Sequence, residues 1–366
     1  MINAMQRVAG LPRLSFLAMS LLAAVHAHAQ DANTPTKPVA QAHAQGAQTS
    51  TLKSKPSPKV KDLPLVLVVG QRASRISNGA TNLDLSIKDT PQSISVVTQD
   101  QMQQFGADSL NDALRLATGI DVEQTSTNTT QFLSRGFEIK NTQIDGVGMP
   151  NGWGVVTNAF DSFGFEKIEV IGGANGLLTG VGNSAGTINY VRKRPTNTEQ
   201  GQLGVTYGSD DRRRVEADYS TPFTKDGRWA GRIIFAREGS DSYLRDFKSD
   251  RTYLYGVVDG QIGENGTLAI GYSWQKSNTS GNMWGALTYS PSDNGSQLEW
   301  PRSASTTQDW TYWNTTTGAA FVEYTYQLGD NWQLKASYNN RIDDNNSQLF
   351  MAYSLSGLDP VTGKGL

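Results

Sequence analysis

Cysteine is absent from the 366-residue sequence, and histidine occurs only three times. The lack of cysteine excludes disulfide bonds, thiolate metal sites and a cysteine nucleophile. The histidines are His26, His28 and His43, all upstream of the part that we expect to fold, so that part has neither a histidine base nor a histidine metal ligand. Most hydrolase and metalloenzyme mechanisms are thereby excluded there, and an enzyme is the function that the sequence favours least.

The sequence also lacks an excess of positive charge and a long apolar run. The formal net charge is −2, which argues against nucleic acid as a main partner. Beyond the N-terminus no apolar run approaches the ~20 residues of a membrane-spanning helix. If the protein sits in a membrane, it must therefore do so as a β-barrel. The length suggests two domains.

The first 29 residues have the pattern of a secretory signal peptide. Two arginines precede the apolar stretch Leu14–Val25, and Ala27–Ala29 forms a small-residue cleavage site. A membrane anchor is the alternative, but the apolar stretch is short for one. Residues 30–62 have almost no large apolar side chain and are rich in Ala, Gln, Thr, Lys and Pro. This composition predicts a disordered periplasmic tail.

Residues 63–70 (LPLVLVVG) form a short apolar run, rich in valine, directly after this tail. One interpretation is the first strand of the next domain. The other is an extended segment that adds as a strand to the sheet edge of a partner, with backbone hydrogen bonds supplying affinity and alternate side chains supplying specificity.

Residues 71–198 predict one α/β unit. Thr98 is placed to cap a short helix with Gln101 as its capping-box partner, and Ser109 is placed to cap a second helix that ends at Gly119. The expected buried face of the second helix is Leu110, Ala113, Leu114 and Ala117. Strands are expected at 92–98, 120–124 and 131–137, a hairpin turn at Asp145-Gly146, and two strands around a glycine-rich loop in 165–195.

Residues 199–366 change to alternating strands of about ten residues. Large apolar residues face one side and mostly polar or small residues the other, as at Leu268, Ile270, Tyr272 and Trp274. Short connections near Thr221–Gly227, Gly263–Gly266 and Gly329–Asn331 alternate with long ones from about Gly239 to Arg251 and from Ser277 to Thr315. This pattern is typical of a transmembrane barrel. A soluble β-sandwich is the alternative, against which the signal peptide, the strand length and the aromatic residues at strand ends all argue.

Five motifs recur in an order that resembles the N-terminal part of TonB-dependent siderophore receptors, especially the ferric-coprogen and ferric-pyoverdine type. They are DTPQSISVVTQDQM (Asp89–Met102), SLNDALRLATGI (Ser109–Ile120), SRGF (Ser134–Phe137), QIDGV (Gln143–Val147) and FEKIEVIGGANGLLTGVGNSAGTINYVRKRP (Phe165–Pro195). The resemblance implies an α+β plug domain (71–198) followed by an antiparallel transmembrane β-barrel, of which 199–366 would supply about the first eight of about 22 strands. We therefore expect the chain to be a fragment of a longer receptor or a truncated product.

The resemblance also implies an outer-membrane receptor of a Gram-negative bacterium that takes up a ferric siderophore with energy from TonB and its inner-membrane complex. Residues 63–70 would be the TonB box, with Leu65, Val66, Leu67, Val68 and Val69 as its TonB-binding residues. Iron would arrive already chelated, so no cofactor and no protein metal ligands are expected. Import of another cargo (cobalamin, an oligosaccharide or haem) and a passive channel or adhesin are the alternatives.

Three tryptophans are the expected ligand contacts. Trp153 lies after the Asp-Gly turn of the plug, Trp284 matches a family segment whose tryptophan faces the siderophore, and Trp310 lies in the same long loop. Arg135 matches a family arginine that locks the plug to glutamates of the barrel. The second locking arginine of the family is replaced here by Gly172. Outer-membrane lipid is the remaining expected partner.

Overall fold

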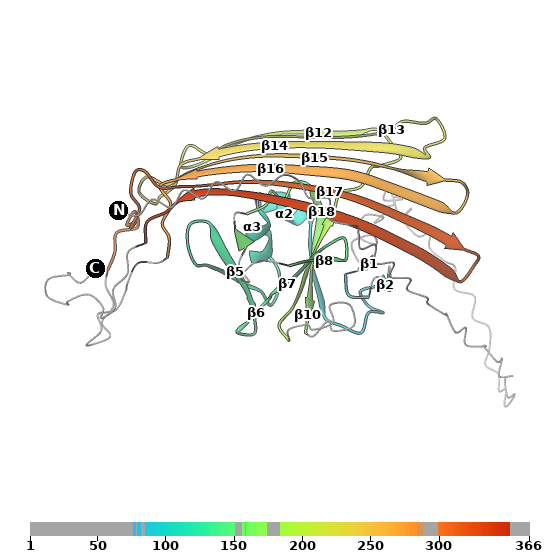
Figure 1. Ribbon diagram of the computed structural model, residues 1–366, viewed down its shortest axis with the longest axis horizontal. Helices are drawn as coiled ribbons and strands as arrows, with labels where there is room; N and C mark the ends of the chain where they lie inside the picture. Colours follow the sequence, from blue (N-terminus) through green and yellow to red (C-terminus); the bar gives the residue numbers. More distant parts are fainter. Residues whose placement is uncertain are drawn as a thin grey trace, which may run out of the picture.

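The computed structural model describes residues 76–77, 79–81, 85–150, 156–157, 159–173, 184–285, 287 and 299–351. The predicted signal peptide, tail and TonB box (63–70) lie outside these residues. The described chain has two layers. A long curved antiparallel sheet, here called the wall, lies over an α/β unit, here called the plug (Figure 1).

The plug is built around one five-stranded sheet in the order β3-β10-β11-β7-β8, with β4, β5, β6 and β9 in a smaller sheet. Its elements are β1 (Ile76–Ser77), β2 (Leu85–Ser86), β3 (Ile94–Thr98), α2 (Gln99–Gln104), α3 (Leu110–Arg115), β4 (Asp121–Gln124), β5 (Thr129–Ser134), β6 (Phe137–Glu138), β7 (Asn141–Ile144), β8 (Val147–Pro150), β9 (Val156–Thr157), β10 (Phe165–Gly172) and β11 (Gly186–Arg192). Neither helix among the described residues is long and apolar enough to cross a membrane.

Both helices begin where the sequence predicts. Thr98 and Gln101 form the capping box of α2, and the Ser109 side chain accepts the Asp112 N–H at the start of α3. The four apolar residues expected on one face of the second helix are all buried, in one cluster with β10 and β11. The helix itself ends at Arg115, earlier than predicted, and Gly119 (φ +80°) lies in the turn before β4.

Two turns decide the strand pattern of the plug. Asp145 (φ 50°) and Gly146 (φ 80°) form the predicted hairpin turn between β7 and β8. The single strand expected over 131–137 is wrong, because Arg135 (φ 54°) and Gly136 (φ 80°) also take left-handed conformations and separate β5 from β6. Arginine followed by glycine is a weaker turn signal than aspartate followed by glycine.

The wall has seven antiparallel strands in chain order. They are β12 (Gln200–Tyr207), β13 (Arg213–Pro222), β14 (Trp229–Ser240), β15 (Lys248–Ile262), β16 (Gly266–Ser280), β17 (Tyr312–Leu328) and β18 (Trp332–Gln348). The expected strand length of about ten residues is too short for the later strands, because β15 to β18 run for 15 to 17 residues each. In the described part of the chain the sheet is open, with β12 and β18 at its edges.

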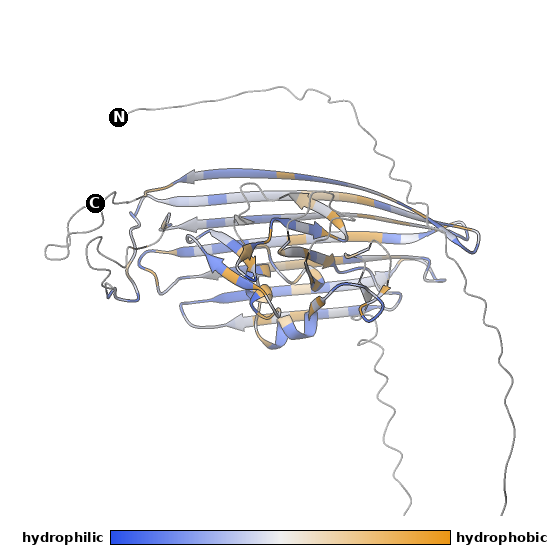
Figure 2. Cartoon of the chain, turned by 90° about the horizontal axis from the view of Figure 1, so that it is seen from below, coloured by the Kyte–Doolittle hydropathy of each residue, from blue (hydrophilic) through white to orange (hydrophobic). Residues whose placement is uncertain are grey.

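The two faces of the wall differ in polarity. Apolar and polar residues are mixed along its long strands (Figure 2). Large apolar side chains such as Leu203, Ile233 and Ile270 are exposed on the face away from the plug. The opposite face carries a second apolar cluster in which Phe163 of the plug packs on Ile234, Tyr253, Tyr255 and Phe321. This arrangement is that of a barrel wall with an apolar outer face.

From β14 onward the connections of the wall alternate in length, as predicted. Short turns join β13 to β14, β15 to β16 and β17 to β18, whereas residues 241–247 and 281–311 form longer loops at the other end. The helices of the plug lie toward the long-loop end and β1 and β2 toward the short-turn end (Figure 1).

Candidate functional site

The inner face of β13 carries a row of charges that the plug must neutralise. Arg214, Glu216 and Asp218 alternate along this strand with Val215 and Ala217, so all three charged side chains point toward the plug. Arg214 is 1% exposed and Asp218 is 5% exposed. Charges buried this deeply are stable only with partners.

Asp161 of the plug is the partner of Arg214. Arg214 donates to both carboxylate oxygens, at 2.8 and 2.9 Å, in a bidentate pair. Arg251 of β15 donates to the same carboxylate at 3.2 Å, and so does the Phe163 N–H at 3.0 Å. The Asp161 N–H donates in turn to Gln275 on β16. One fully buried aspartate therefore joins three strands of the wall.

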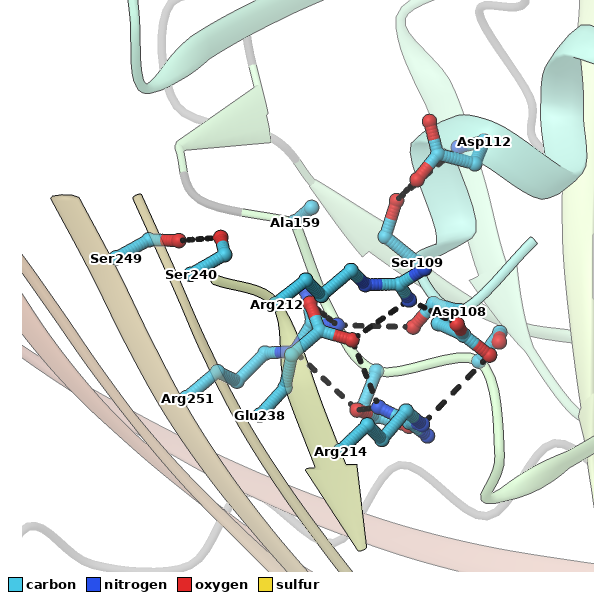
Figure 3. A network of polar contacts seen from close by, with 12 residues as sticks. Asp108, Ser109, Asp112, Ala159, Arg212, Arg214, Glu238, Ser240, Ser249 and Arg251 are labelled. Carbon is cyan, nitrogen blue, oxygen red and sulfur yellow. Dashed lines mark hydrogen bonds and ion pairs between the residues drawn. The ribbon is translucent and has the colours of Figure 1, made fainter. Parts of the chain in front are cut away.

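A second plug aspartate extends this network (Figure 3). Asp108 forms an ion pair with Arg212, and Arg212 also pairs with Glu238 of β14 at 2.9 Å. Arg251, which already contacts Asp161, connects Asp161 to these residues, because it donates to the Asp108 carbonyl oxygen at 3.0 Å and lies 3.3 Å from Glu238. We call Asp108, Asp161, Arg212, Arg214, Glu238 and Arg251 the upper network.

The electrostatics of Asp161 keep it charged. Burial by itself would raise the pKa of the Asp161 carboxyl, but the nearby Arg251 and Arg214 and the Phe163 N–H outweigh this effect. The pKa of Asp161 therefore lies below its ordinary value.

A second cluster fixes the end of the plug where the chain enters the wall. Lys193 is 1% exposed, and its Nζ lies 2.9 Å from Asp218 of β13 and 4.1 Å from the centre of the Phe163 ring. Burial, opposed by Asp218, lowers the pKa of the Lys193 amine. Arg194 bridges Asp145 of the plug and Glu323 of β17, at 3.3 and 3.4 Å.

A third contact joins the plug to the base of the 281–311 loop. The Asn282 side chain donates to Asn128 at 3.0 Å, and Asn128 donates to Thr279 at 2.9 Å. The Thr127 N–H donates to the Met283 carbonyl oxygen. A polar cavity of about 210 Å³ lies next to this contact and is lined by residues of both layers, including Ser109, Asn128 and Arg251. The plug is thus held at the level where the long loops begin.

Two predicted ligand contacts lie on these loops, apart from the charge networks. Trp284 stacks on Trp313, with ring centres 5.6 Å apart and planes at 23°, and remains 47% exposed. Trp310 meets Phe350 edge-on at 6.3 Å and is 44% exposed. Trp153 and the TonB-binding residues Leu65 to Val69 lie outside the described residues.

Arg135 lies in the β5–β6 turn, and its side chain is exposed. The described residues give it no ion pair, so its locking role stays a prediction. At Gly172 a Cβ would lie 3.5 Å from the Ser93 carbonyl oxygen, an ordinary contact, so backbone crowding does not explain the missing arginine.

Sequence reasoning missed the upper network entirely. The one usable signal was the charged inner row of β13, because a strand in a barrel wall has no reason to bury Arg214 and Asp218 unless something inside the barrel carries the opposite charges. The opposite charges come from Asp161 and Asp108, which precede Arg214 in the chain by 53 and 106 residues. Neither aspartate lies in a local motif that would mark it for this role.

Replacing Asp161 by asparagine should loosen the plug from the wall. Arg214 and Arg251 would keep their buried positions without a countercharge, at a cost of about 3–5 kcal/mol. The measurement is pulse proteolysis of the plug across a urea series in detergent. The matched control is Asp211→Asn, whose side chain is 64% exposed and 3.8 Å from Arg213; its effect should stay below about 1 kcal/mol. Equal effects of the two substitutions would contradict the assignment.

Acid should weaken the same contact. The pKa of Asp161 is lowered in the folded protein, so its stabilisation is complete above the ordinary carboxyl pKa of 3.8 and is lost as the pH falls below it. Plug stability measured between about pH 5 and pH 3 should therefore fall more steeply in the natural protein than in Asp161→Asn. If plug stability falls equally with pH in both proteins, Asp161 does not contribute the pH-dependent stabilisation.

Comparison with known proteins agrees with this geometry. The family described as TonB-dependent Receptor Plug Domain matches residues 86–187. The ferripyoverdine receptor of Pseudomonas aeruginosa is 30% identical over 273 residues, 74% of this chain and 34% of that protein. The ferric-pyoverdine 358 receptor of Pseudomonas putida is 32% identical over 275 residues, 73% of this chain and 32% of that protein.

Solved structures show the same layers. The Pseudomonas aeruginosa ferripyoverdine receptor bound to ferripyoverdine superposes with a TM-score of 0.69 at 29% identity, over 74% of this chain and 37% of that one. The alcaligin receptor of Bordetella pertussis superposes with a TM-score of 0.63 at 28% identity, over 80% of this chain and 45% of that one. The chain spans about a third of the length of the curated relatives that it matches. The chain belongs to the TonB-dependent receptor family, with its plug domain over residues 86–187 and the first part of its β-barrel in the wall.

Proposed function

We propose that this chain is part of an outer-membrane receptor that imports a ferric siderophore with energy supplied through TonB. The observation that carries the proposal is a plug held against the inner face of a barrel wall by buried ion pairs at Asp161 and Lys193. A barrel that served as a passive channel would gain nothing from an occluding domain attached so firmly. The relatives with the same two layers are named as siderophore receptors.

The chelate would bind at the long-loop end. Trp153, Trp284 and Trp310 are the proposed ligand contacts, and the stacked pair of Trp284 and Trp313 offers an exposed aromatic surface there. Aromatic side chains with one face free are well suited to bind flat organic groups. Iron would arrive inside its chelator, so the protein needs no iron ligands of its own and no cofactor.

Energy would enter at the opposite end. Residues 63–70 would pair as a strand with TonB in the periplasm, and a pull on this segment would be transmitted to the plug. The proposal is tested by growth of an iron-starved strain that lacks other siderophore receptors, with a panel of ferric siderophores and with or without a protonophore. Rescue by at least one siderophore, abolished by the protonophore, is expected. Rescue by none, or rescue that survives the protonophore, would contradict it.

A proline at Val68 should separate binding from transport. Proline removes a backbone donor from the strand that TonB would pair with, so uptake should be lost while ligand binding at the cell surface is retained. The control is Thr49→Pro in the expected disordered tail, which should transport normally. Normal uptake by Val68→Pro at natural membrane levels would refute the assignment of residues 63–70.

Replacing Trp284 by alanine should weaken ligand binding. Loss of a partly buried aromatic anchor typically costs about 2 kcal/mol or more, equivalent to about a 30-fold rise in Kd. The control is Trp332→Ala, because Trp332 is 39% exposed and lies at the short-turn end of β18. Fluorescence titration of the purified receptor with the ferric siderophore measures both. Unchanged affinity in Trp284→Ala would place the ligand elsewhere.

A further inference from the structure

The two stacked tryptophans of the proposed ligand site are held by different layers of the protein. Trp313 belongs to β17 and is fixed within the wall, because its indole Nε1 donates to Asn345 of β18 at 3.1 Å. Trp284 lies beyond the end of β16, in the loop that follows this strand. The backbone just before it contacts the plug, since the N–H and the hydroxyl of Thr127 both donate to the Met283 carbonyl oxygen at 3.2 Å. The stacking of Trp284 on Trp313 therefore depends on a contact with the plug.

One buried amide joins three segments of the chain two residues before Trp284. The Asn282 side chain is fully buried, and its Nδ2 donates to Thr127 at 3.1 Å and to Asn128 at 3.0 Å, both in the β4–β5 turn of the plug. The Asn282 carbonyl oxygen accepts the hydroxyl of Thr307 at 2.9 Å, from the far stem of the same loop. Thr307 is fully buried as well. Hydrogen bonds are stronger in a buried site than at a surface, so Asn282 fixes the start of the loop to the plug and to the far stem.

The Thr279 hydroxyl on β16 connects this amide to Trp313. It accepts Nδ2 of Asn128 at 2.9 Å and Nδ2 of Asn282 at 3.0 Å. It donates to the Trp313 carbonyl oxygen at 2.7 Å, a shorter contact than the 3.2 Å to Asn282 Oδ1. A hydroxyl can accept twice and donate once, so these three bonds fill its capacity. The plug amide of Asn128 thus helps to orient the hydroxyl that holds the Trp313 backbone.

The neighbouring loop of the wall supports the same position. Gly281 has a φ of +69°, and a Cβ there would clash with the Asp246 carbonyl oxygen of that loop. Arg245, also in that loop, donates to the carbonyl oxygens of Ser305 and Thr307 at 2.9 and 3.2 Å. Both stems of the tryptophan-bearing loop are therefore packed against neighbouring backbone, which gives its first residues one well-defined place.

The spacing of the tryptophan pair decides how it could meet a ligand. The ring centres of Trp284 and Trp313 are 5.6 Å apart. A third flat ring between them would need about 7 Å, twice the carbon–carbon contact distance of roughly 3.5 Å. A flat group can therefore add only to an outer side of the pair, and the exposed ring of Trp284 offers such a side.

We propose that Thr127 and Asn128, in the β4–β5 turn of the plug, are positioning residues of the ligand site: they hold Trp284 in the stacked arrangement that receives a flat conjugated group of the ferric chelate. They act through Asn282 and Thr279 and need not touch the chelate. The inference rests on the proposed function, because the chelate is the ligand. An aromatic surface that is already ordered binds more tightly than one that must be ordered on binding.

Circular dichroism of the purified receptor without ligand tests the positioning directly. Two stacked indole rings couple their electronic transitions and give a paired band of opposite signs, which the difference between the natural protein and Trp284→Ala isolates. Asn128→Ala should remove most of this band, because Trp284 loses its fixed place. The matched control is Thr125→Ala in the same turn, whose hydroxyl bonds to Thr129 within the turn, and it should keep the band. An undiminished band in Asn128→Ala would overturn the proposal.

The consequence is measured with the ferric siderophore that rescues growth in the panel. Asn128→Ala should raise its Kd about tenfold, whereas Thr125→Ala should change it less than about twofold. Trp284→Ala, expected to raise the Kd about 30-fold in the natural protein, should raise it only about threefold further in the Asn128→Ala background, because a tryptophan without its fixed place contributes little. Effects of the two substitutions that multiply independently would mean that Asn128 does not act through Trp284.

Plug stability separates positioning from a purely structural role. Asn128→Ala should keep the plug folded in pulse proteolysis, because it leaves the ion pairs of Asp161 and Lys193 in place. A weakened plug with a natural dichroism band and a natural Kd would mean that the contact only joins the two layers, and would overturn the proposal. Thr127→Val, which removes one hydroxyl from the same contact, repeats both measurements if Asn128→Ala is poorly produced.

The two proposals fail in different ways. If the natural protein binds no siderophore of the panel, the proposed function is refuted, and the role of the pair toward the chelate is refuted with it. The dichroism band is measured without ligand, so it still decides whether the plug turn positions Trp284. A siderophore that binds the natural protein and Asn128→Ala with equal Kd would refute the present inference alone.

Discussion

The position of the plug depends on one buried aspartate shared by two arginines. Asp161 meets Arg214 on β13 and Arg251 on β15, and these strands flank β14 in an unbroken antiparallel register. The sheet therefore fixes the two guanidinium groups relative to each other. Asp161 can satisfy both in only one position, and any shift of the plug leaves a desolvated charge without its partner.

The contacts that join the plug to the wall are unevenly distributed along the plug. Ion pairs with the wall are made by Asp108, Asp161 and Lys193. Asp108 lies just before α3, Asp161 just before β10, and Lys193 directly after β11. The N-terminal segment is held differently, by a hydrogen bond from Ser77 to Glu169 of β10. In the described part of the chain, the N-terminal segment thus meets the plug sheet through a hydrogen bond to a buried carboxylate, whereas buried ion pairs join the rest of the plug to the wall.

Sequence alone was sufficient where the determining signal is local. The capping pair of Thr98 and Gln101, the Asp145-Gly146 turn and the alternation of wall strands each depend on residues close together in the chain, and the family resemblance ordered them. The ion pairs could not be predicted in the same way. The partner of Arg214 is selected by how two layers are superposed, and Asp161 stands in no motif that marks it for this role.

The most direct test of this account is a double-mutant cycle between Asp161 and Arg214, using Asp161→Asn, Arg214→Met and the double variant. The free energy of plug release would be measured by pulse proteolysis across a urea series at neutral pH. We expect strong coupling, at least about 1.5 kcal/mol, because each single change leaves a buried partner without its countercharge and the double change removes both charges. Effects that add to within about 0.5 kcal/mol would show that the two side chains act independently and that this contact does not hold the plug to the wall.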